Sequence, residues 1–145
     1  MVLVRKMRKE DFFPLMRLIY EIFPDRYNPN LFLSLYELFP DGFLIAEEYG
    51  NIIGFIIGVK PSIDKGKILL IGVDKRRRRK GIGSMLLKKL IIVFMIKGIR
   101  EIELEVRASN AAAIRFYEKH GFRIASREHA YYEDGEDAYI MVKSL

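Results

Sequence analysis

The sequence predicts an α+β domain built on a mixed β-sheet of about seven strands flanked by about four helices. The first observation is a set of three runs rich in β-branched and aromatic residues, separated by turn-forming residues, which is typical of an antiparallel meander. These runs are residues 43–48, 52–60 and 67–73. The second is a long apolar segment, 81–97, that leads into a further strand, 101–106. The strands before and after this helix are therefore expected to be parallel.

The remaining elements follow from local signals. A short strand at 2–4 precedes a helix at 9–23, which has apolar residues at helical spacing and is expected to end at Pro24. A second short helix is expected over 29–39. Ser109 and Asn110 are expected to cap a helix that runs through His120 and stops at Gly121. A closing hairpin is expected from 122–128 and 138–143, around the acidic turn 133–137.

Composition excludes several classes of protein. With 145 residues the chain has the size of one domain, so a single unit over 1–145 is expected. It has no cysteine and only two histidines, His120 and His129, both expected at the surface, so neither a thiolate nucleophile nor a metal centre is expected. The longest apolar run, 90–96, is too short to span a bilayer, and no targeting signal is visible; a cytoplasmic protein without a membrane partner is expected. The net charge of +6 favours an anionic partner.

Residues 75–84 read KRRRRKGIGS, six basic residues followed by two glycines. A helix that begins near Gly81 offers free backbone N–H groups and the positive end of its dipole to an anion. Gly81 and Gly83 remove side chains where a diphosphate would approach the backbone. Neither the dinucleotide fingerprint GxGxxG nor a P-loop is present. A solvated basic face or a nucleic-acid patch is the alternative, although such a patch does not need two close-approach glycines.

Four segments of the sequence resemble a known family of enzymes. The segment VDKRRRRKGIGSMLL resembles the diphosphate-binding signature of the GNAT superfamily of N-acetyltransferases, whose R/Q-x-x-G-x-G/A core is matched by Arg78, Gly81 and Gly83. A proline that is common near this signature is absent. LEVRASNAAAIRFYEKHGF, 104–122, closely resembles the segment that follows in RimI-type members, which acetylate protein amino termini. YYEDGEDAYIM resembles their closing hairpin, and IFPDRYN is similar to the peptide-contacting loop of some N-terminal acetyltransferases.

The resemblance implies a GNAT fold with a parallel βαβ core, acetyl-CoA as donor and a primary amine as acceptor, most simply a protein N-terminus. It places the cofactor contacts at Ile71, Gly72, Val73, Arg78, Arg79, Lys80, Gly81, Ile82, Gly83, Ser84, Asn110, Ala113 and Tyr117. Capping a helix is a sufficient role for Asn110 by itself. Direct transfer in a ternary complex is expected, because the chain has no cysteine and no serine beside an obvious base.

The acceptor's own chemistry favours an α-amine. An α-amine with a pKa of about 8 is about one-tenth neutral at pH 7, whereas a lysine side chain near 10.4 is neutral about once in 2,500. The difference is about 3 kcal/mol in the cost of preparing the nucleophile. An α-amine therefore needs only a modest base.

The predicted reacting groups are Glu105 and Tyr117. Glu101, Glu103 and Glu105 share one face of their strand because its period is two. Alternation alone explains Glu101 and Glu103 as a solvated face, whereas the resemblance implies that Glu105 is the base. It also implies that Tyr117 donates a proton or hydrogen bond to the departing thiolate; without the resemblance, Tyr117 would be interpreted as a core aromatic residue.

For the acceptor, the resemblance implies contacts from Phe23, Pro24 and Tyr27 in the N-terminal loop and from Tyr131 and Tyr132 in the closing hairpin. Phe23 also fits the last core position of its helix, and paired tyrosines are ordinary strand composition. Two alternatives remain open. One is a lysine or small-molecule amine as acceptor, and the other is a non-catalytic nucleic-acid or ribosome-binding module. The residues favour no particular oligomeric state.

Overall fold

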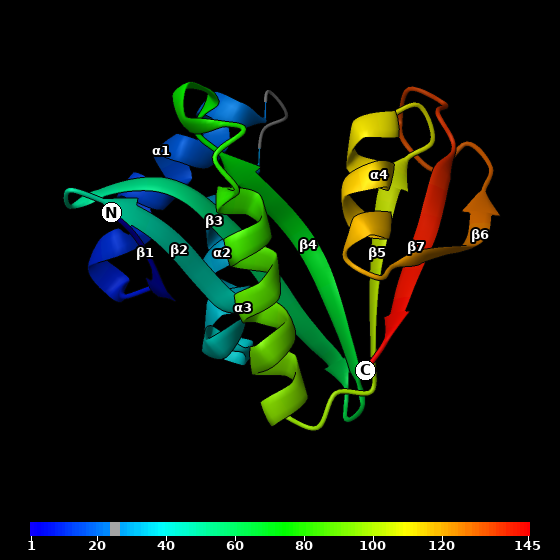
Figure 1. Ribbon diagram of the computed structural model, residues 1–145, viewed down its shortest axis with the longest axis horizontal. Coiled ribbons are helices and arrows are strands. Elements are labelled where there is room, and N and C mark those ends of the chain that lie inside the picture. Colours follow the sequence, from blue (N-terminus) through cyan, green and yellow to red (C-terminus); the bar gives the residue numbers. More distant parts are fainter. Residues whose placement is uncertain (24–26) are drawn as a thin grey trace. The chain divides into compact units, whose positions relative to one another are not determined.

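The computed structural model describes residues 1–23 and 27–145 (Figure 1). Its helices and strands are, in order, β1 (Val2–Lys6), α1 (Phe12–Ile22), α2 (Pro29–Leu38), β2 (Phe43–Glu48), β3 (Asn51–Ser62), β4 (Lys65–Val73), α3 (Ile82–Ile96), β5 (Glu101–Arg107), α4 (Ala111–Lys119), β6 (Arg123–Glu128) and β7 (Ala138–Ser144). The strands of the described residues hydrogen-bond in the order β1-β2-β3-β4-β5-β7-β6. Strands β4 and β5 pair in parallel, and the pairs β1/β2, β2/β3, β5/β7 and β6/β7 are antiparallel. The predicted α+β class, mixed sheet and parallel pair are confirmed.

Several boundaries differ from the prediction, by up to three residues. The first helix, expected from residue 9, begins at Phe12, because residues 9–11 form a 3₁₀ turn closed by the Asp11 N–H on the Arg8 carbonyl at 2.9 Å. Strand β3 continues to Ser62 and β4 begins at Lys65, so the predicted turn over 61–66 is only residues 63–64. Pro61 is tolerated there because the end of a strand does not require every ladder N–H.

Contacts divide the chain into two compact units, and the first comprises Met1–Val59 and Ile68–Lys97. Within it, α1 and α2 cover one face of the strands and α3 covers the other (Figure 1). Successive side chains of a strand point to opposite faces, so alternate residues of β2 and β3 serve the two layers. Phe43, Ile45, Phe55 and Ile57 belong to the buried cluster under α1 and α2.

Helix α3 approaches the opposite face closely because glycine faces it. A Cβ built on Gly58 would lie 2.9 Å from the Phe94 ring and 3.0 Å from Leu90, closer than side-chain packing permits. Leu86, Leu90 and Phe94 are fully buried on this side of α3. The close packing fixes the helix axis and therefore the place of its N-terminus, just after β4.

The second unit comprises Lys60–Lys67 and Gly98–Leu145. Strand β7 lies between β5 and β6, and Glu105 faces Ile140 in the β5/β7 ladder. The alternation predicted for β5 is confirmed, because Ile102, Leu104 and Val106 are buried while the glutamates between them are half-buried. The first residues of β4 pair with β5 within this unit, with Lys67 opposite Glu103.

Two smaller expectations have different outcomes. His129 is exposed, as predicted, and lies 3.2 Å from Asp137. His120, also expected at the surface, is only partly exposed, because it follows directly on α4 and its ring lies 4.9 Å from the Phe116 ring. Among the helices of the described residues, none is both long and apolar enough to cross a membrane.

Candidate functional site

The N-terminus of α3 in the first unit has the geometry expected of an anion-binding site. Gly81 is its N-cap, with a left-handed φ of 76°. The first intrahelical hydrogen bond runs from the Met85 N–H to the Gly81 carbonyl at 3.0 Å, so the amides of Ile82 and Gly83, which precede it, have no acceptor within the helix. Apart from its two chain neighbours, no described residue has an atom within 4 Å of a Cβ built on Gly81, which leaves this turn open to a ligand. These groups suit a diphosphate.

Arg79, two residues before Gly81, also has a left-handed φ, of 65°. Such a conformation is costly for a residue with a side chain and is concentrated at ligand sites. Sequence patterns gave no signal for it.

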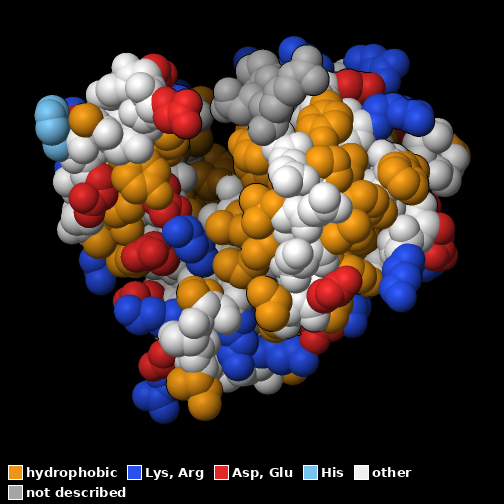
Figure 2. Space-filling view, turned by 180° about the vertical axis from the view of Figure 1, so that it is seen from behind, with side chains coloured by type: hydrophobic (Ala, Val, Ile, Leu, Met, Phe, Trp, Pro, Cys, Tyr) orange, Lys and Arg blue, Asp and Glu red, His pale blue; other side chains and the backbone are white. Residues whose placement is uncertain are grey.

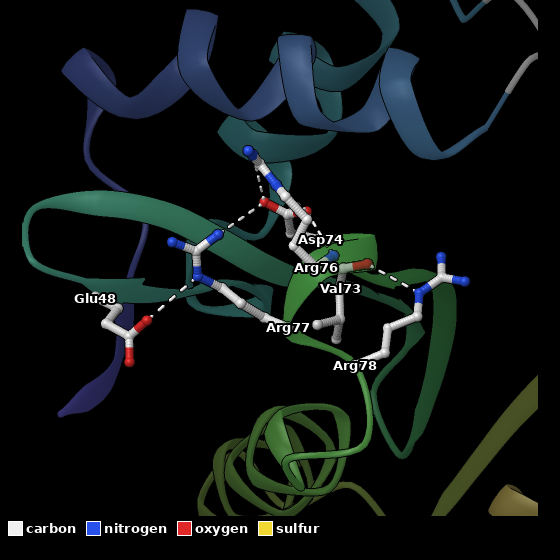
Figure 3. A network of polar contacts seen from close by, with 6 residues as sticks. All are labelled: Glu48, Val73, Asp74, Arg76, Arg77 and Arg78. Atoms are coloured by element: carbon white, nitrogen blue, oxygen red, sulfur yellow. Dashed lines mark hydrogen bonds and ion pairs between the residues drawn. The ribbon is translucent and has the colours of Figure 1, made fainter.

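The basic run separates into two groups (Figure 3). Arg76 and Arg77 both form ion pairs with Asp74, and in each pair a guanidinium nitrogen lies 3.1 Å from the Asp74 carboxylate. Arg77 also forms an ion pair with Glu48, at 3.2 Å. The hydrogen bond from the Arg76 side chain holds the pKa of Asp74 below its usual range. Arg78 extends away from this group and donates from Nε to the Val73 carbonyl at 3.3 Å.

Three members of the run remain available to a ligand. Lys75, Arg79 and Lys80 are exposed, and no ion pair joins them to any residue within 1–23 or 27–145. Only half of the run is thus free, and its remaining residues brace the turn after β4. This division fits a braced loop beside a helix terminus better than a continuous basic face.

The other predicted cofactor residues of this unit lie around the same turn. Ile71 and Val73 are half-buried at the end of β4, and Gly72 between them is buried. The Ile82 side chain is a core residue with 2% exposure, so only its amide can face a ligand. Gly83 and Ser84 are half-buried in the first turn of α3.

In the second unit, Glu105 is at the centre of a three-residue contact. The Lys67 Nζ lies 2.6 Å from Glu105 Oε1, and the Tyr131 hydroxyl donates to the same oxygen at 2.9 Å. This hydrogen bond is the leading cause that raises the pKa of Tyr131. No residue of the described chain donates to Glu105 Oε2, which leaves that oxygen for a further partner.

Sequence reasoning missed Lys67, although a signal was present. The predicted parallel pairing of β4 with β5 places lysines beside a strand that carries three glutamates, and the register sets Lys65 opposite Glu101 and Lys67 opposite Glu103. Complementary charges on paired strands indicate a cross-strand ion pair.

Tyr117 lies in α4 and is 7% exposed. Burial raises its pKa to about 12. Among the described residues none accepts a hydrogen bond from its hydroxyl, and that oxygen is not fully buried. It is therefore an unused donor with access to solvent.

Asn110 caps α4, as predicted, because its Oδ1 accepts the Ala113 N–H at 3.1 Å. The amide nitrogen of Asn110 donates to no described residue, so this donor is available to a ligand. Ala113 is half-buried in the first turn of the same helix.

Arg107, a second residue that the sequence analysis missed, contacts the loop that carries the two tyrosines. Its guanidinium carbon lies 4.0 Å from the centroid of the Tyr132 ring. Its Nη1 donates to Asp134 at 2.9 Å and to Glu136 at 3.0 Å. Burial is the leading cause that raises the pKa of Tyr132.

The predicted N-terminal acceptor contacts have a structural role in the first unit. Phe23 is half-buried, with its ring 6.4 Å from those of Phe55 and Tyr27. Tyr27 is half-buried against Phe32, at 5.6 Å between ring centroids. Pro24 lies outside the described residues. Packing thus accounts for Phe23 and Tyr27, and their acceptor role stays a prediction.

Two other surface features of the first unit contain none of the predicted site residues. A pocket of about 410 Å³ is lined by Arg17 and Glu21 of α1, Asn51 of β3 and the Asp74 turn. Hydrophobic side chains also gather over the α1–α2 side of this unit (Figure 2), and exposed residues there include Phe13 and Leu38. Neither feature brings together groups suited to acyl transfer.

Comparison with known proteins gives a consistent result. Residues 9–122 match the model of the acetyltransferase (GNAT) family. An uncharacterized N-acetyltransferase of Methanocaldococcus jannaschii is 38% identical over 145 residues, covering 98% of this chain and 91% of that protein. An N-alpha-acetyltransferase of Sulfurisphaera tokodaii is 30% identical over 154 residues, covering 98% and 92%.

Solved structures are also similar to this chain over nearly its whole length. Ard1 from Thermoplasma volcanium is 33% identical with a TM-score of 0.93, over 99% of this chain and 97% of that one. Naa50 of Arabidopsis thaliana, in complex with the bisubstrate analogue CoA-Ac-MVNAL, is 29% identical with a TM-score of 0.88, over 99% of both chains.

Proposed function

Because the chain belongs to the GNAT acetyltransferase family, and is thus an enzyme that uses acetyl-CoA, we propose that its acceptor is the α-amine of a protein N-terminus. The observation that carries the proposal is the hydrogen bond from the Tyr131 hydroxyl to Glu105 Oε1, 2.9 Å long. It joins the predicted base to the hairpin predicted to bind the acceptor. The relatives named N-alpha-acetyltransferase and the peptide-linked analogue bound by Naa50 support the same acceptor class.

On the donor side, the residues present fit acetyl-CoA. The amides of Ile82 and Gly83 and the positive end of α3 bind the diphosphate, and the open space over Gly81 admits it. Lys75, Arg79 and Lys80 add positive charge without being neutralised by the described chain. The amide nitrogen of Asn110 is the group it has left to donate to the pantetheine arm. When bound, acetyl-CoA supplies the acetyl thioester.

Glu105 takes the proton of the acceptor amine, directly or through a water, with Oε2 as the free oxygen. Lys67 and Tyr131 hold the other oxygen and so orient the carboxylate. Since an α-amine of pKa about 8 is already about one-tenth neutral at pH 7, a carboxylate is a sufficient base.

Tyr117 donates a hydrogen bond to the departing thiolate. Its pKa of about 12 exceeds that of a thiol, about 8.5, by more than three pKa units. Complete proton transfer from the tyrosine to the sulfur is therefore unfavourable. The neutral phenol, in contrast, is present at every pH below about 12, and donation needs only that form. The structure thus favours hydrogen-bond donation over general-acid transfer.

We expect Tyr117→Phe to lower kcat about tenfold to a hundredfold, since a hydrogen bond to a charged group contributes about 1.5–3 kcal/mol. The affinity for CoA should change by less than about threefold, because the ring and its packing are kept. Steady-state kinetics and calorimetry with CoA measure the two effects. Full activity in this variant would remove Tyr117 from the mechanism.

A peptide panel tests the acceptor. Peptides with free or blocked amino termini, with and without lysine, are incubated with labelled acetyl-CoA. Label is expected on free amino termini whether or not lysine is present, and not on blocked peptides. Labelling of blocked lysine peptides alone, or of small amines alone, would overturn the α-amine assignment.

Contact with ribosomal RNA is a second candidate property, favoured by the three exposed and unpaired cations Lys75, Arg79 and Lys80. Phosphate contacts of this kind make binding salt-dependent. If CoA competes with RNA, the same cations serve both ligands. If RNA does not bind at about 0.15 M salt, these residues serve the cofactor only.

A further inference from the structure

Arg107, the last residue of β5, ties down the loop between β6 and β7, residues 129–137. It donates to two carboxylates of that loop, Asp134 and Glu136, and stacks on the Tyr132 ring at 4.0 Å. The second oxygen of Glu136 accepts the Ser109 N–H at 2.9 Å. Three points of the loop are therefore attached to the end of β5 and the residues after it.

The loop is also closed by its own backbone. The Tyr132 N–H donates to the Glu136 carbonyl at 3.1 Å, and the Gly135 N–H donates to the Tyr132 carbonyl at 2.9 Å. These bonds shape the turn, but both partners lie within it. A backbone bond from the Ala108 N–H to the Asp137 carbonyl, 3.0 Å long, joins the end of the loop to the segment after β5. The Tyr132 side chain itself contacts the Arg107 guanidinium and the Tyr131 ring.

A continuous set of contacts leads from Arg107 to the predicted base. The Tyr132 ring packs edge-on against the Tyr131 ring at 5.1 Å, and the Tyr131 hydroxyl donates to Glu105 at 2.9 Å. Glu105 and Arg107 are two residues apart in β5, so their side chains leave the same face of the strand. One strand face therefore carries the predicted base and the anchor of the loop that contacts it.

We propose that Arg107 is a positioning residue for acetyl transfer, which holds Tyr132 and the acidic turn so that the Tyr131 hydroxyl reaches Glu105 and the acceptor meets a preformed loop. The inference rests on the proposed function, in which Glu105 and Tyr131 face the acceptor. A loop ordered before binding lowers the entropic cost of receiving a peptide. Arginine suits the role because its planar guanidinium stacks on the Tyr132 ring while one of its nitrogens donates to two carboxylates, whereas the lysine ammonium is a point charge with no planar face to stack.

The kinetic test uses Arg107→Met and Arg107→Lys, with Arg123→Met as the matched control. Arg123 is an exposed arginine of β6 in the same unit, and no ion pair joins it to any described residue. Arg107→Met should raise the KM for the peptide about tenfold and leave the KM for acetyl-CoA within about twofold. Arg107→Lys should recover part of the loss. Equal rises in both KM values, or no change, would overturn the proposal.

A double-mutant cycle shows whether Arg107 acts through the tyrosine. In a Tyr131→Phe background the hydroxyl that reaches Glu105 is already absent. Arg107→Met should then lower kcat/KM for the peptide by less than about twofold, because two residues that act through one contact are not additive. A full additional tenfold loss would mean that the arginine acts independently of Tyr131.

A measurement of the Tyr131 pKa does not depend on enzyme activity, so it tests the role of Arg107 separately from the proposed function. The pKa of Tyr131 is raised by its hydrogen bond to Glu105, with further contributions from burial and from the charges of Glu105, Glu103 and Glu128. NMR of the ¹³Cζ-labelled tyrosine follows its titration in each variant. Arg107→Met should lower the midpoint toward the ordinary phenol value of about 10, and Arg123→Met should not.

The outcomes are distinguishable. If the wild-type protein acetylates peptides, but neither the coupling nor the shift of Tyr131 is found, the role of Arg107 is wrong and the proposed function stands. If the wild-type protein acetylates no peptide, the proposed function fails and with it the catalytic role of Arg107, whatever the titration shows. Thermal melts of all variants establish that each is folded.

Discussion

Glu105→Gln is expected to lower kcat for a peptide acceptor by about a hundredfold or more, since a positioned general base contributes about 10²–10⁴. The amide cannot take a proton from the amine, although it retains the shape of the side chain and can still accept the hydrogen bond of Tyr131. Only acceptor that is already neutral in solution then reacts. The residual rate should therefore rise with pH up to about 8, following the α-amine. Steady-state kinetics between pH 6 and about 9 measure both effects.

Glu101→Gln is the matched control. Glu101 is on the same face of β5, is half-buried to a similar extent and loses the same charge, but it lies four residues from Glu105 at the start of the strand. Its kcat should stay within about twofold of wild type. If both variants keep full activity, Glu105 is not the base, and the Lys67–Glu105–Tyr131 contact only supports the structure. If both lose activity equally, the loss comes from the charge of the strand face.

Gly81→Asp is expected to weaken acetyl-CoA binding by about a hundredfold. The backbone there is left-handed, with φ of 76°, a conformation that aspartate tolerates better than most residues, and open space surrounds a built Cβ. The new carboxylate would stand where the diphosphate approaches the free amides of α3. Two like charges about 5 Å apart at an effective dielectric constant of about 20 repel by about 3 kcal/mol. Calorimetric titration with CoA measures the loss.

Gly98→Asp at the opposite end of α3 is the control for this change. Gly98 has nearly the same φ, 79°, and the same open surroundings, so the backbone strain and the added charge are matched. A helix of 15 residues is about 22 Å long at 1.5 Å per residue, so this carboxylate is remote from the cradle. CoA affinity should be unchanged. Equal losses at both glycines would mean that the diphosphate is not bound at the start of α3.

Local signals were sufficient for most of the fold. The period of two in β5, the cap at Asn110 and the glycines around α3 each act over a few residues, and each predicted its element within about three residues. The position of β7 between β5 and β6 had no such signal. Strand order depends on which hydrophobic faces meet after the chain has folded. The hairpin pattern predicts only that β6 and β7 pair with each other, and either of the two could then lie next to β5.

The same distinction applies to the candidate site. Residues of a single turn or strand, such as Gly81 and Glu105, could be predicted as site residues, the first from spacing and resemblance and the second from resemblance. Lys67 was missed because it is 38 residues from Glu105, and Arg107 because its partners lie 27 and 29 residues away. Contacts across such separations depend on strand register, which no local pattern specifies.

The basic run, residues 75–80, has some features that local sequence predicts and others that only distant contacts decide. Its charge and its glycines were visible in the sequence and indicated an anion. Its division into braced arginines, Arg76 and Arg77 on Asp74, and free cations was not visible, because it depends on which carboxylates the folded turn brings near.

The class of fold, the helix terminus predicted to bind an anion and the strand with the predicted base all followed from the amino-acid sequence, because backbone sterics and side-chain periodicity act between near neighbours. The tertiary structure alone decided which lysine, tyrosine and arginine surround that base and where β7 lies. Those contacts join segments far apart in the chain, and they form only when burial of the core fixes the register of the strands that carry them.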